Sequence, residues 1–268
     1  MSVREGLDDT QPAFAEQGGI NNSIKDHEMT RTVWVAALIF CATGAYAEGT
    51  WTFGLIGGGT KGVYVGEDDY TYGVVPMLSY DTERLHIGLD GVSYEAFDYG
   101  IGTVSLSLGY RGAPDFPDKD LFKGLKRDGA VEAGIGTMLN FGDAYLGLDV
   151  SKDITDAHKG TEATATIGYV LDAGAFQVDI AIGAKYRDAK LNQYLYGVTA
   201  AEATSVRAAY TAEKTTTGFA SLTVGYPITD SVTLIGSVDY EDLGKSAESP
   251  LVKEQHPVSF GLGAIMRF

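Results

Sequence analysis

The side chains that could perform acid–base or nucleophilic chemistry are four histidines and the acidic and hydroxyl groups around them. His158 lies with Asp153 in the long polar segment 151–160, a setting typical of a solvated loop histidine. His256 and Ser259 are three residues apart, so on a strand their side chains point to opposite faces. A hydrolase needs a nucleophile beside a base that a third group orients. The sequence therefore predicts no catalytic residue and no enzymatic activity.

The stretch 57–69 begins with three consecutive glycines, Gly57-Gly58-Gly59, and ends with the consecutive acids Glu67, Asp68 and Asp69. Dedicated calcium loops space their oxygen ligands along the chain, whereas these three acids are adjacent. The glycines lack the Gly-Lys-Ser/Thr and the following helix of a phosphate-binding loop. We expect a solvated acidic loop from 57 to 69, with no metal and no cofactor.

A further group of charged residues falls at alternate positions within apolar segments, where all would share one face of a sheet. These residues are Glu132, Asp149, Glu162, Asp179, Lys185, Asp239 and Arg267. Two interpretations are open. In the first, the inward charges pair with one another across a filled barrel; in the second, they line a narrow pore that favours cations. The sequence favours a plugged or narrow lumen over a conducting one.

The elements that would carry these residues are strands, because apolar and small or polar residues alternate over segments of roughly ten residues. A tilted membrane strand needs about this length. The run that contains Pro76 is weaker, since proline cannot donate to a sheet ladder. The alternating segments are 51–55, 74–80, 85–89, 92–96, 103–110, 131–141, 145–150, 162–169, 176–186, 219–226, 231–240 and 260–268.

Short and long connections alternate along the chain. The short ones are 142–143, 171–174 and 227–230, and the long polar ones are 112–128, 151–160, 187–215 and 241–255. This alternation is typical of outer-membrane barrels, with short periplasmic turns and long extracellular loops. Tyrosines at strand ends on the apolar face predict aromatic girdles at the lipid–water boundary. These are Tyr110, Tyr169, Tyr186, Tyr226 and Tyr240.

The segment 260–268 predicts the strand that closes the barrel and inserts it into the membrane. Its apolar face consists of Phe260, Leu262, Ala264, Met266 and Phe268. If this strand descends to the periplasm, the region 84–97 must hold two strands for the first strand to start there as well. The sequence thus predicts an all-β, transmembrane, antiparallel up-and-down barrel of about 12 strands, with ten as the alternative.

Two segments precede the barrel, which we expect over 48–268. Residues 1–28 are polar and aperiodic and predict a mis-assigned or disordered extension. Residues 29–47 combine a basic start, a short apolar core and small residues at Ala45 and Ala47, the pattern of a cleaved signal peptide. Cys41, the single cysteine, lies in this segment, so the exported protein would contain no disulfide. The net charge of −16 argues against nucleic acid as a partner.

Five short stretches follow one another along the mature chain: Tyr64-Val65-Gly66-Glu67-Asp68, Asp120-Leu121 with Gly124-Leu125, Asp149-Val150-Ser151 leading to Ala157-His158-Lys159-Gly160, Tyr194-Leu195-Tyr196-Gly197-Val198 with Ala201-Glu202, and Ser249-Pro250-Leu251-Val252. In these stretches and their order, the chain from about Trp51 to Phe268 resembles the MltA-interacting protein (MipA)/OmpV family of Gram-negative outer-membrane proteins. Gly62 departs from the family pattern, which usually has proline before the tyrosine-glycine element.

This resemblance implies an exported barrel in the outer membrane of a Gram-negative bacterium, in contact with its lipid. It also implies a scaffold that links a murein lytic transglycosylase to a bifunctional peptidoglycan synthase during cell-wall growth. The alternatives are a narrow small-solute channel and a surface adhesin, which would use the loop 187–215. Composition and spacing do not choose between these roles.

Overall fold

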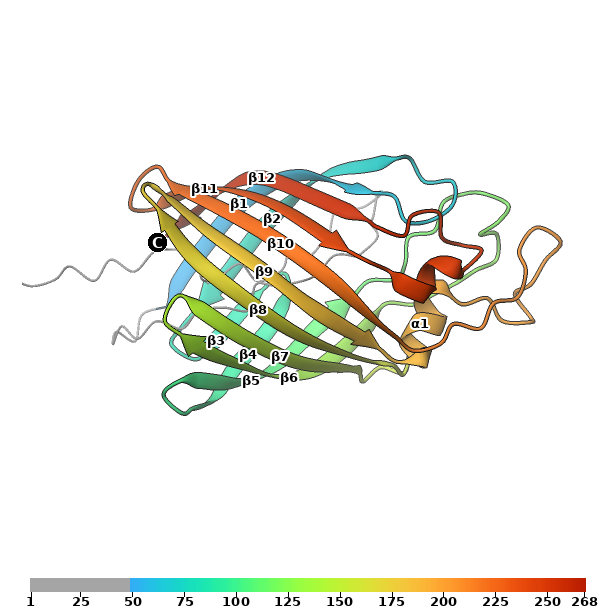
Figure 1. Cartoon of the computed structure of the whole chain (residues 1–268), viewed down its shortest axis with the longest axis horizontal. Coiled ribbons are helices and arrows are strands. Elements are labelled where there is room, and N and C mark those ends of the chain that lie inside the picture. The colour runs from blue at the N-terminus through green and yellow to red at the C-terminus, as the bar shows by residue number, and fades with distance from the viewer. Residues whose placement is uncertain (1–48) are drawn as a thin grey trace, which may run out of the picture.

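Alternation with a period of two produces strands whose apolar side chains point outward and whose small and polar side chains point inward. The computed structural model describes residues 49–268, so the predicted signal peptide with Ala45 and Ala47 lies outside the described residues. Twelve antiparallel strands form a closed barrel in which each strand pairs with its sequence neighbours and β1 pairs with β12 (Figure 1). The predicted fold class and the prediction of twelve strands are confirmed.

The strands are β1 (Thr50–Lys61), β2 (Tyr70–Asp81), β3 (Leu85–Gly88), β4 (Gly91–Asp98), β5 (Gly102–Arg111), β6 (Ala130–Phe141), β7 (Ala144–Asp153), β8 (Thr161–Ala173), β9 (Phe176–Arg187), β10 (Thr215–Pro227), β11 (Val232–Glu241) and β12 (Val258–Arg267). The helix α1 (Ala189–Tyr196) and a short 3₁₀ helix (Gly244–Glu248) lie in the last two long connections. Neither is long and apolar enough to cross a membrane, and no other helix occurs in residues 49–268.

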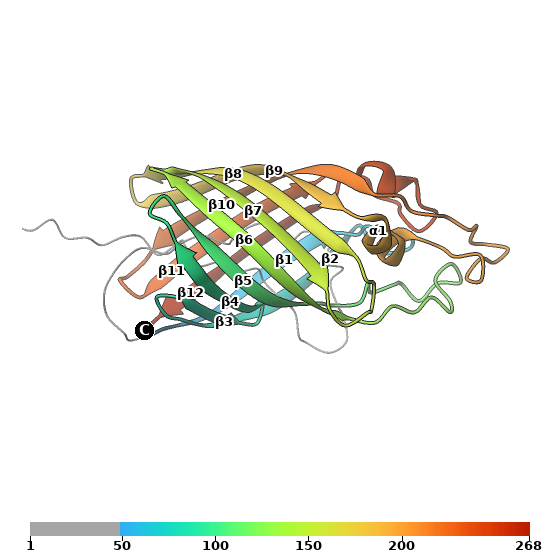
Figure 2. The ribbon, with the colours of Figure 1, turned by 90° about the horizontal axis from the view of Figure 1, so that it is seen from below.

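The two ends of the barrel differ. One end carries five short turns: 82–84, 99–101, 142–143, 174–175 and 228–231. The other end carries the long connections 62–69, 112–129, 154–160, 188–214 and 242–257. Figure 2 shows α1 and the long loops at one end of the tilted strands and the short turns at the other. In an outer-membrane barrel the short turns face the periplasm and the long loops face outward.

The outer face of the wall is apolar across its middle and aromatic near its ends. Leu262 is 70% exposed and Ile167 is 61% exposed, as expected of side chains that face lipid. All five tyrosines predicted for the girdles are exposed. Tyr110, Tyr186 and Tyr240 lie at the long-loop end, and Tyr169 and Tyr226 lie towards the short-turn end. The wall therefore presents a lipid-facing band between two aromatic rings.

One expected connection is wrong. Residues 57–69 were expected to form a loop, but β1 continues to Lys61 and the connection covers only 62–69. Gly58 pairs with Gly261 of β12 on one side and with Gly73 of β2 on the other. Glycine has a weak intrinsic preference for strands, and the two neighbouring strands override that preference here.

The predicted closing strand corresponds to β12. It pairs with β1 from Thr52 opposite Arg267 to Thr60 opposite Ser259. Just beyond it, the backbones of Trp51 and Phe268 exchange hydrogen bonds of 3.1 and 3.0 Å. Of the expected apolar face, Phe260, Leu262, Met266 and Phe268 are exposed, and Ala264 is half-buried.

Candidate functional site

The inward-facing residues near the long-loop ends of β5 to β11 include six charged side chains, which we call the charged belt. Its members are Arg111, Glu132, Glu162, Lys185, Arg187 and Glu241. The pairing of the strands brings them together, since Glu162 of β8 lies directly opposite Arg187 of β9. Three acids and three bases occupy the belt, so it carries no net charge when all are ionised.

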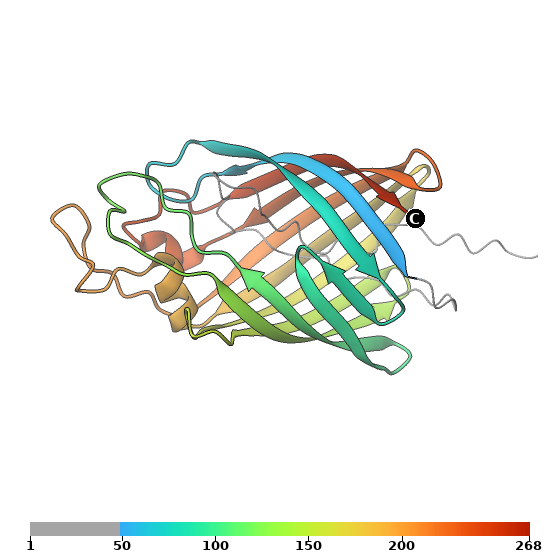
Figure 3. The same cartoon turned by 180° about the vertical axis from the view of Figure 1, so that it is seen from behind.

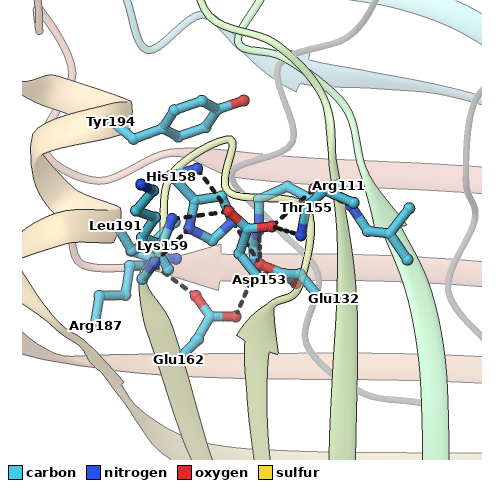
Figure 4. A network of polar contacts seen from close by, with 12 residues as sticks. Arg111, Glu132, Asp153, Thr155, His158, Lys159, Glu162, Arg187, Leu191 and Tyr194 are labelled. Carbon is cyan, nitrogen blue, oxygen red and sulfur yellow. Dashed lines mark hydrogen bonds and ion pairs between the residues drawn. The ribbon is translucent and has the colours of Figure 1, made fainter.

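The belt is a continuous chain of ion pairs, and Figure 4 shows the part of it that runs from Arg111 to Arg187. Arg111 donates from Nε to Glu132 Oε1 at 2.7 Å and from Nη2 to Glu132 Oε2 at 3.0 Å, which is a bidentate pair. The same Nη2 lies 3.3 Å from Glu162 Oε1. Glu162 Oε2 accepts from Arg187 Nε at 2.7 Å. Each arginine thus bridges two carboxylates on different strands.

The belt ends in a deeply buried trio. Arg187 Nη2 lies 2.7 Å from Glu241 Oε1, and Lys185 Nζ donates to Glu241 Oε2 at 2.9 Å. The side chains of Glu241, Lys185 and Arg187 are 0%, 2% and 3% exposed. Charges buried to this degree persist only when they are paired. The trio therefore fastens β9 to β11 across the lumen side of β10.

His158 contradicts its expected setting. It was expected to be a solvated loop histidine, but its side chain is fully buried. Its Nε2 lies 3.0 Å from Glu132 Oε1, and its Nδ1 accepts from the backbone N–H of Gly160 at 3.0 Å. Its ring also packs on Tyr194, with 5.1 Å between ring centroids. His158 therefore joins the 154–160 loop both to the belt and to α1.

Asp153 holds this loop in shape. Its carboxylate accepts hydrogen bonds from the backbone N–H groups of Thr155, His158 and Lys159 at 2.7 to 2.8 Å. It also accepts from the Thr155 hydroxyl at 2.8 Å. The loop is thus folded around one acidic side chain, which explains how a short polar segment can bury a histidine.

Above the belt, buried apolar side chains from four long connections form a cluster that we call the loop cap. Its members are Val63, Tyr64, Phe122, Leu125, Leu191, Tyr194, Leu195, Tyr196, Val198, Leu243 and Leu251. Because these residues come from connections far apart in sequence, the cap ties the whole long-loop end together. The cap is an apolar core outside the barrel wall.

The helix α1 lies at the centre of the cap. It begins after Asp188, whose side chain accepts from the backbone N–H of Leu191 at 2.9 Å as an N-cap. Leu191 and Tyr196 are fully buried, and so is the polar Asn192. Asn192 donates to the backbone oxygen of Glu213 at 2.7 Å and to the Thr215 hydroxyl at 2.9 Å. The buried amide nitrogen of Asn192 thus ties α1 to the start of β10.

Hydrogen bonds fasten the loops to α1. Tyr64 donates to the backbone oxygen of Leu195 at 3.1 Å, and Ser249 donates to that of Tyr196 at 2.6 Å. Arg127 donates to the backbone oxygen of Tyr194 at 2.8 Å. Burial raises the pKa of Tyr196 to about 12, so its hydroxyl stays protonated in the cap.

A second ion pair lies at the edge of the cap. Arg127 Nη1 donates to Glu202 Oε1 at 2.7 Å, and Glu202 also accepts from the backbone N–H and the hydroxyl of Thr199 at 2.8 and 2.9 Å. Burial alone would raise the pKa of Glu202. The hydrogen bonds from Arg127 and Thr199 outweigh this effect and lower the pKa from 4.5 to about 2.

The predicted lumen charges lie at three places along the barrel. Glu132, Glu162 and Lys185 belong to the belt, and Arg267 lies near the short-turn end of β12. Asp149, Asp179 and Asp239 lie farther from the long loops, on β7, β9 and β11. Among these three, Asp179 accepts from the Tyr145 hydroxyl at 3.1 Å.

The sequence patterns predict only half of the belt. They do not mark Arg111, and they place Arg187 and Glu241 in long loops. The signal that could have found Arg187 is the alternation of β9, which continues inward through Gly183, Lys185 and Arg187. A strand extended by one residue would have placed it beside Glu162.

The belt resembles a seal more than a catalytic centre, because each of its charged side chains contacts an opposite charge. His158 is the group nearest to a general base, and both of its nitrogens are engaged. Within residues 49–268, no cluster of three or more His, Cys, Asp or Glu side chains is arranged to hold a metal ion.

The family model named MltA-interacting protein MipA matches residues 53–268. The chain belongs to this family. Omp26La of Vibrio anguillarum is 27% identical over 192 residues, covering 70% of this chain and 75% of that protein. OmpV of Vibrio cholerae is 27% identical over 191 residues, covering 69% of this chain and 74% of that protein. YiaT of Escherichia coli K12 is 23% identical over 200 residues, with coverages of 72% and 81%.

These relatives are named as outer membrane proteins, and this member of the MipA family is likewise an outer-membrane β-barrel. The likeness to solved structures is loose. A loop-deletion mutant of OmpT, an outer membrane protein of Vibrio cholerae, has a TM-score of 0.40 at 10% identity, covering 82% of this chain and 99% of that one. The assignment rests on the family match and on the closed barrel.

Several stretches that carry the family resemblance meet at the long-loop end. Tyr64 and Leu251 lie in the cap, and His158 contacts the belt. Glu202 and Ser249 anchor the loops around α1. Motifs that are short and distant in sequence therefore build one structural unit.

Proposed function

We propose that this barrel is a non-enzymatic, non-conducting scaffold of the outer membrane. It holds a murein lytic transglycosylase and a peptidoglycan synthase at its periplasmic face. The observation that supports the proposal is that the long-loop end holds two layers, the ion pairs of the charged belt and the buried apolar core of the loop cap. A barrel that two such layers close is suited to present a surface rather than to pass solutes along its axis.

The partner class comes from the family, whose name describes interaction with MltA. A periplasmic enzyme can reach only the short-turn end of the barrel. An exposed carboxylate lies in, or within two residues of, each of the five turns at this end: Glu83, Asp98, Asp143, Asp172 and Asp230. We call this set the acidic rim. Arg84 is the exposed base among the turns, so the rim is net acidic and suits a partner with a basic face.

The test is capture of envelope proteins by the folded barrel, used as bait in detergent. We expect a lytic transglycosylase and a murein synthase among the captured proteins. A rim variant replaces Glu83 by Gln and Asp98, Asp143, Asp172 and Asp230 by Asn. Because these charges steer and orient a partner, capture should fall in this variant and should weaken with salt in the native chain.

A matched control neutralises five exposed acids at the opposite end: Asp68→Asn, Asp118→Asn, Asp120→Asn, Asp156→Asn and Glu248→Gln. It removes the same charge and should leave capture unchanged. If both variants lose capture equally, the effect is one of net charge and the rim is not the docking surface. If the native barrel captures neither enzyme, the scaffold proposal is wrong.

The second candidate is a narrow channel that favours cations. The observation in its favour is the lumen position of Asp149, Asp179 and Asp239 below the belt. Stepwise conductance of the native barrel in a planar bilayer, with cation selectivity lost in the triple Asn variant, would support this candidate over the scaffold.

A further inference from the structure

The barrel wall is not hydrogen-bonded over its full height. β3 has four residues and β4 has eight, whereas their neighbours β2 and β5 have twelve and ten. β2 pairs with β3 only from Ser79 to Asp81, and one further hydrogen bond joins Leu89 N to Leu78 O. On the other side, the ladder between β4 and β5 begins at Gly91 opposite Gly109. Beyond the Leu89–Asp90 turn, towards the long loops, no described strand lies between β2 and β5.

Figure 3 shows this interruption, with the cyan β2 passing the tip of the β3–β4 hairpin and the green β5 and β6 on the far side of the tip. The edge of β2 that faces it runs over residues 70–77, which pair with β1 on their other side. Neighbouring strands are spaced about 4.8 Å apart, so two missing strands correspond to a separation of roughly 14 Å between β2 and β5.

The chemistry of this edge is specific. Backbone N–H and C=O groups of alternate residues point to opposite sides of a strand. Leu78 points its C=O towards β3, so Tyr70, Tyr72, Val74 and Pro76 point theirs into the interruption. Proline has no N–H, and Pro76 therefore removes a donor where no described strand would accept it. The interruption explains why β2 tolerates a proline, the residue that makes this strand harder to predict from the sequence.

An unpaired strand edge is costly against lipid, because hydrocarbon offers no hydrogen bonds. Irregular backbone at membrane depth is tolerated where it is buried in protein or lines a water-filled cavity. A further strand that paired with this edge of β2 would lack one hydrogen bond, because Pro76 has no N–H to donate. Pro76 therefore argues against a partner strand that completes the ladder. The edge is thus suited to face water from the lumen.

The lumen beside the edge has an apolar side. Ile56, Val75, Ile235 and Ile265 point inward from β1, β2, β11 and β12, and each is at most 6% exposed. Ile56 lies opposite Val75, and Gly263 lies between Ile56 and Ile235 in the sheet. The acids Asp149 and Asp179 lie on β7 and β9, and Asp239 lies on β11 four residues beyond Ile235, towards the long loops. The lumen therefore has an apolar side, from β2 through β1 and β12 to Ile235 of β11, and an acidic side, from β7 through β9 to Asp239 of β11.

We infer that the interruption between β2 and β5 is a lateral opening, through which small amphipathic molecules pass between the lumen and the membrane lipid. The molecules would have an apolar body, which the isoleucine side accepts, and a neutral or positively charged polar end, which the acidic side accepts. The inference is independent of the scaffold proposal, because the cap closes the axial path while the side path remains.

The first test is backbone amide exchange of the folded barrel in lipid. We expect the amides of Tyr70, Tyr72 and Val74 to exchange about tenfold or more faster than those of Thr71, Gly73 and Val75, which face β1. If all six are equally protected, a strand covers the edge and the opening does not exist.

The second test is entry of N-phenyl-1-naphthylamine, an apolar aromatic amine, into cells that produce the barrel. We expect faster entry than in cells without it. Inserting Thr-Val-Thr-Val on each side of Leu89–Asp90 lengthens the hairpin along β2 and should abolish the excess. The same eight residues inserted after Asp118, in a long loop, should not. Should the lengthened hairpin fail to fold, Val75→Trp fills the lumen beside the edge and should give the same loss. Entry that is unchanged in both variants, or no faster than without the barrel, would overturn the inference.

Discussion

At the scale of single residues, the belt depends on Glu241, whose carboxylate contacts two buried cations. In Glu241→Gln, Lys185 loses its charged partner and Arg187 keeps only Glu162. Breaking a buried ion pair from one side typically costs about 3–5 kcal/mol. We expect a loss of this size in the free energy of unfolding, measured by urea titration in lipid. Glu248→Gln removes an exposed acid nearby and should change it little; an equal loss in both variants would contradict the role of the belt.

Glu202 gives the cap a defined response to acid. Its pKa is lowered from 4.5 to about 2 in the folded protein, so its contribution is complete above pH 4.5 and is lost as the pH falls towards 2. We expect pepsin to cleave the 112–129 and 188–214 loops faster as the pH falls through this range. Glu202→Gln should be cleaved faster throughout, with a flatter dependence on pH. A native profile that is as flat as that of the variant would disprove the assignment.

Residue-level features were the hardest to predict from the sequence. The alternation placed Glu132, Glu162 and Lys185 on the inward face, but ion pairing depends on which strands are neighbours and in what register. The prediction that His158 is a solvated loop histidine is wrong for the same reason, because its burial depends on Glu132 and Tyr194, which are distant in sequence. A single sequence does not contain that information in readable form.

At the scale of elements, α1 sits against the 154–160 loop at a contact that only glycine allows. A Cβ added to Gly160 would lie 2.6 Å from the backbone nitrogen of Leu191 and 2.7 Å from its Cβ. Arg207 is buried in the native protein. We expect Gly160→Ala to displace α1 and expose Arg207, so that trypsin cleaves faster after this residue. In the control Gly236→Ala, the added Cβ has 3.8 Å to its nearest neighbour and cleavage should stay at the native rate. Identical rates in both variants would show that the contact is not needed.

Elements with strong alternation were predicted well, whereas α1 and the end of β1 were not. Strands such as β8 and β9 carry an apolar face that repeats every two residues, and the short turns between them are marked by Gly and Asp. The helix α1 is only eight residues long and buries the polar Asn192 together with its apolar residues, so it lacks the long one-sided pattern that identifies a surface helix. In β1, three glycines indicated a loop, and only pairing with β2 and β12 makes them a strand.

At the scale of the whole molecule, the cap decides whether the barrel conducts. We expect no steady conductance of the native protein in a planar bilayer. Replacing 188–214 by a short Gly/Ser linker removes α1 with most of the cap. This variant should conduct ions along the lumen. A control variant replaces only the exposed tip 203–206 by Gly-Gly, which leaves α1 in place. This control should show no conductance. A native barrel that conducts as well as the 188–214 variant would exclude the cap as a seal.

The seam between β1 and β12 has a consequence for how the barrel assembles. Its paired residues are separated by 199 positions at Thr60–Ser259 and by 215 at Thr52–Arg267. Contacts between such distant parts of a chain form slowly, and until they form β1 and β12 each have an unsatisfied side. Synthesis must therefore be almost complete before the cylinder can shut. Until then, the unpaired edges of β1 and β12 are free to form hydrogen bonds with strand edges of other molecules.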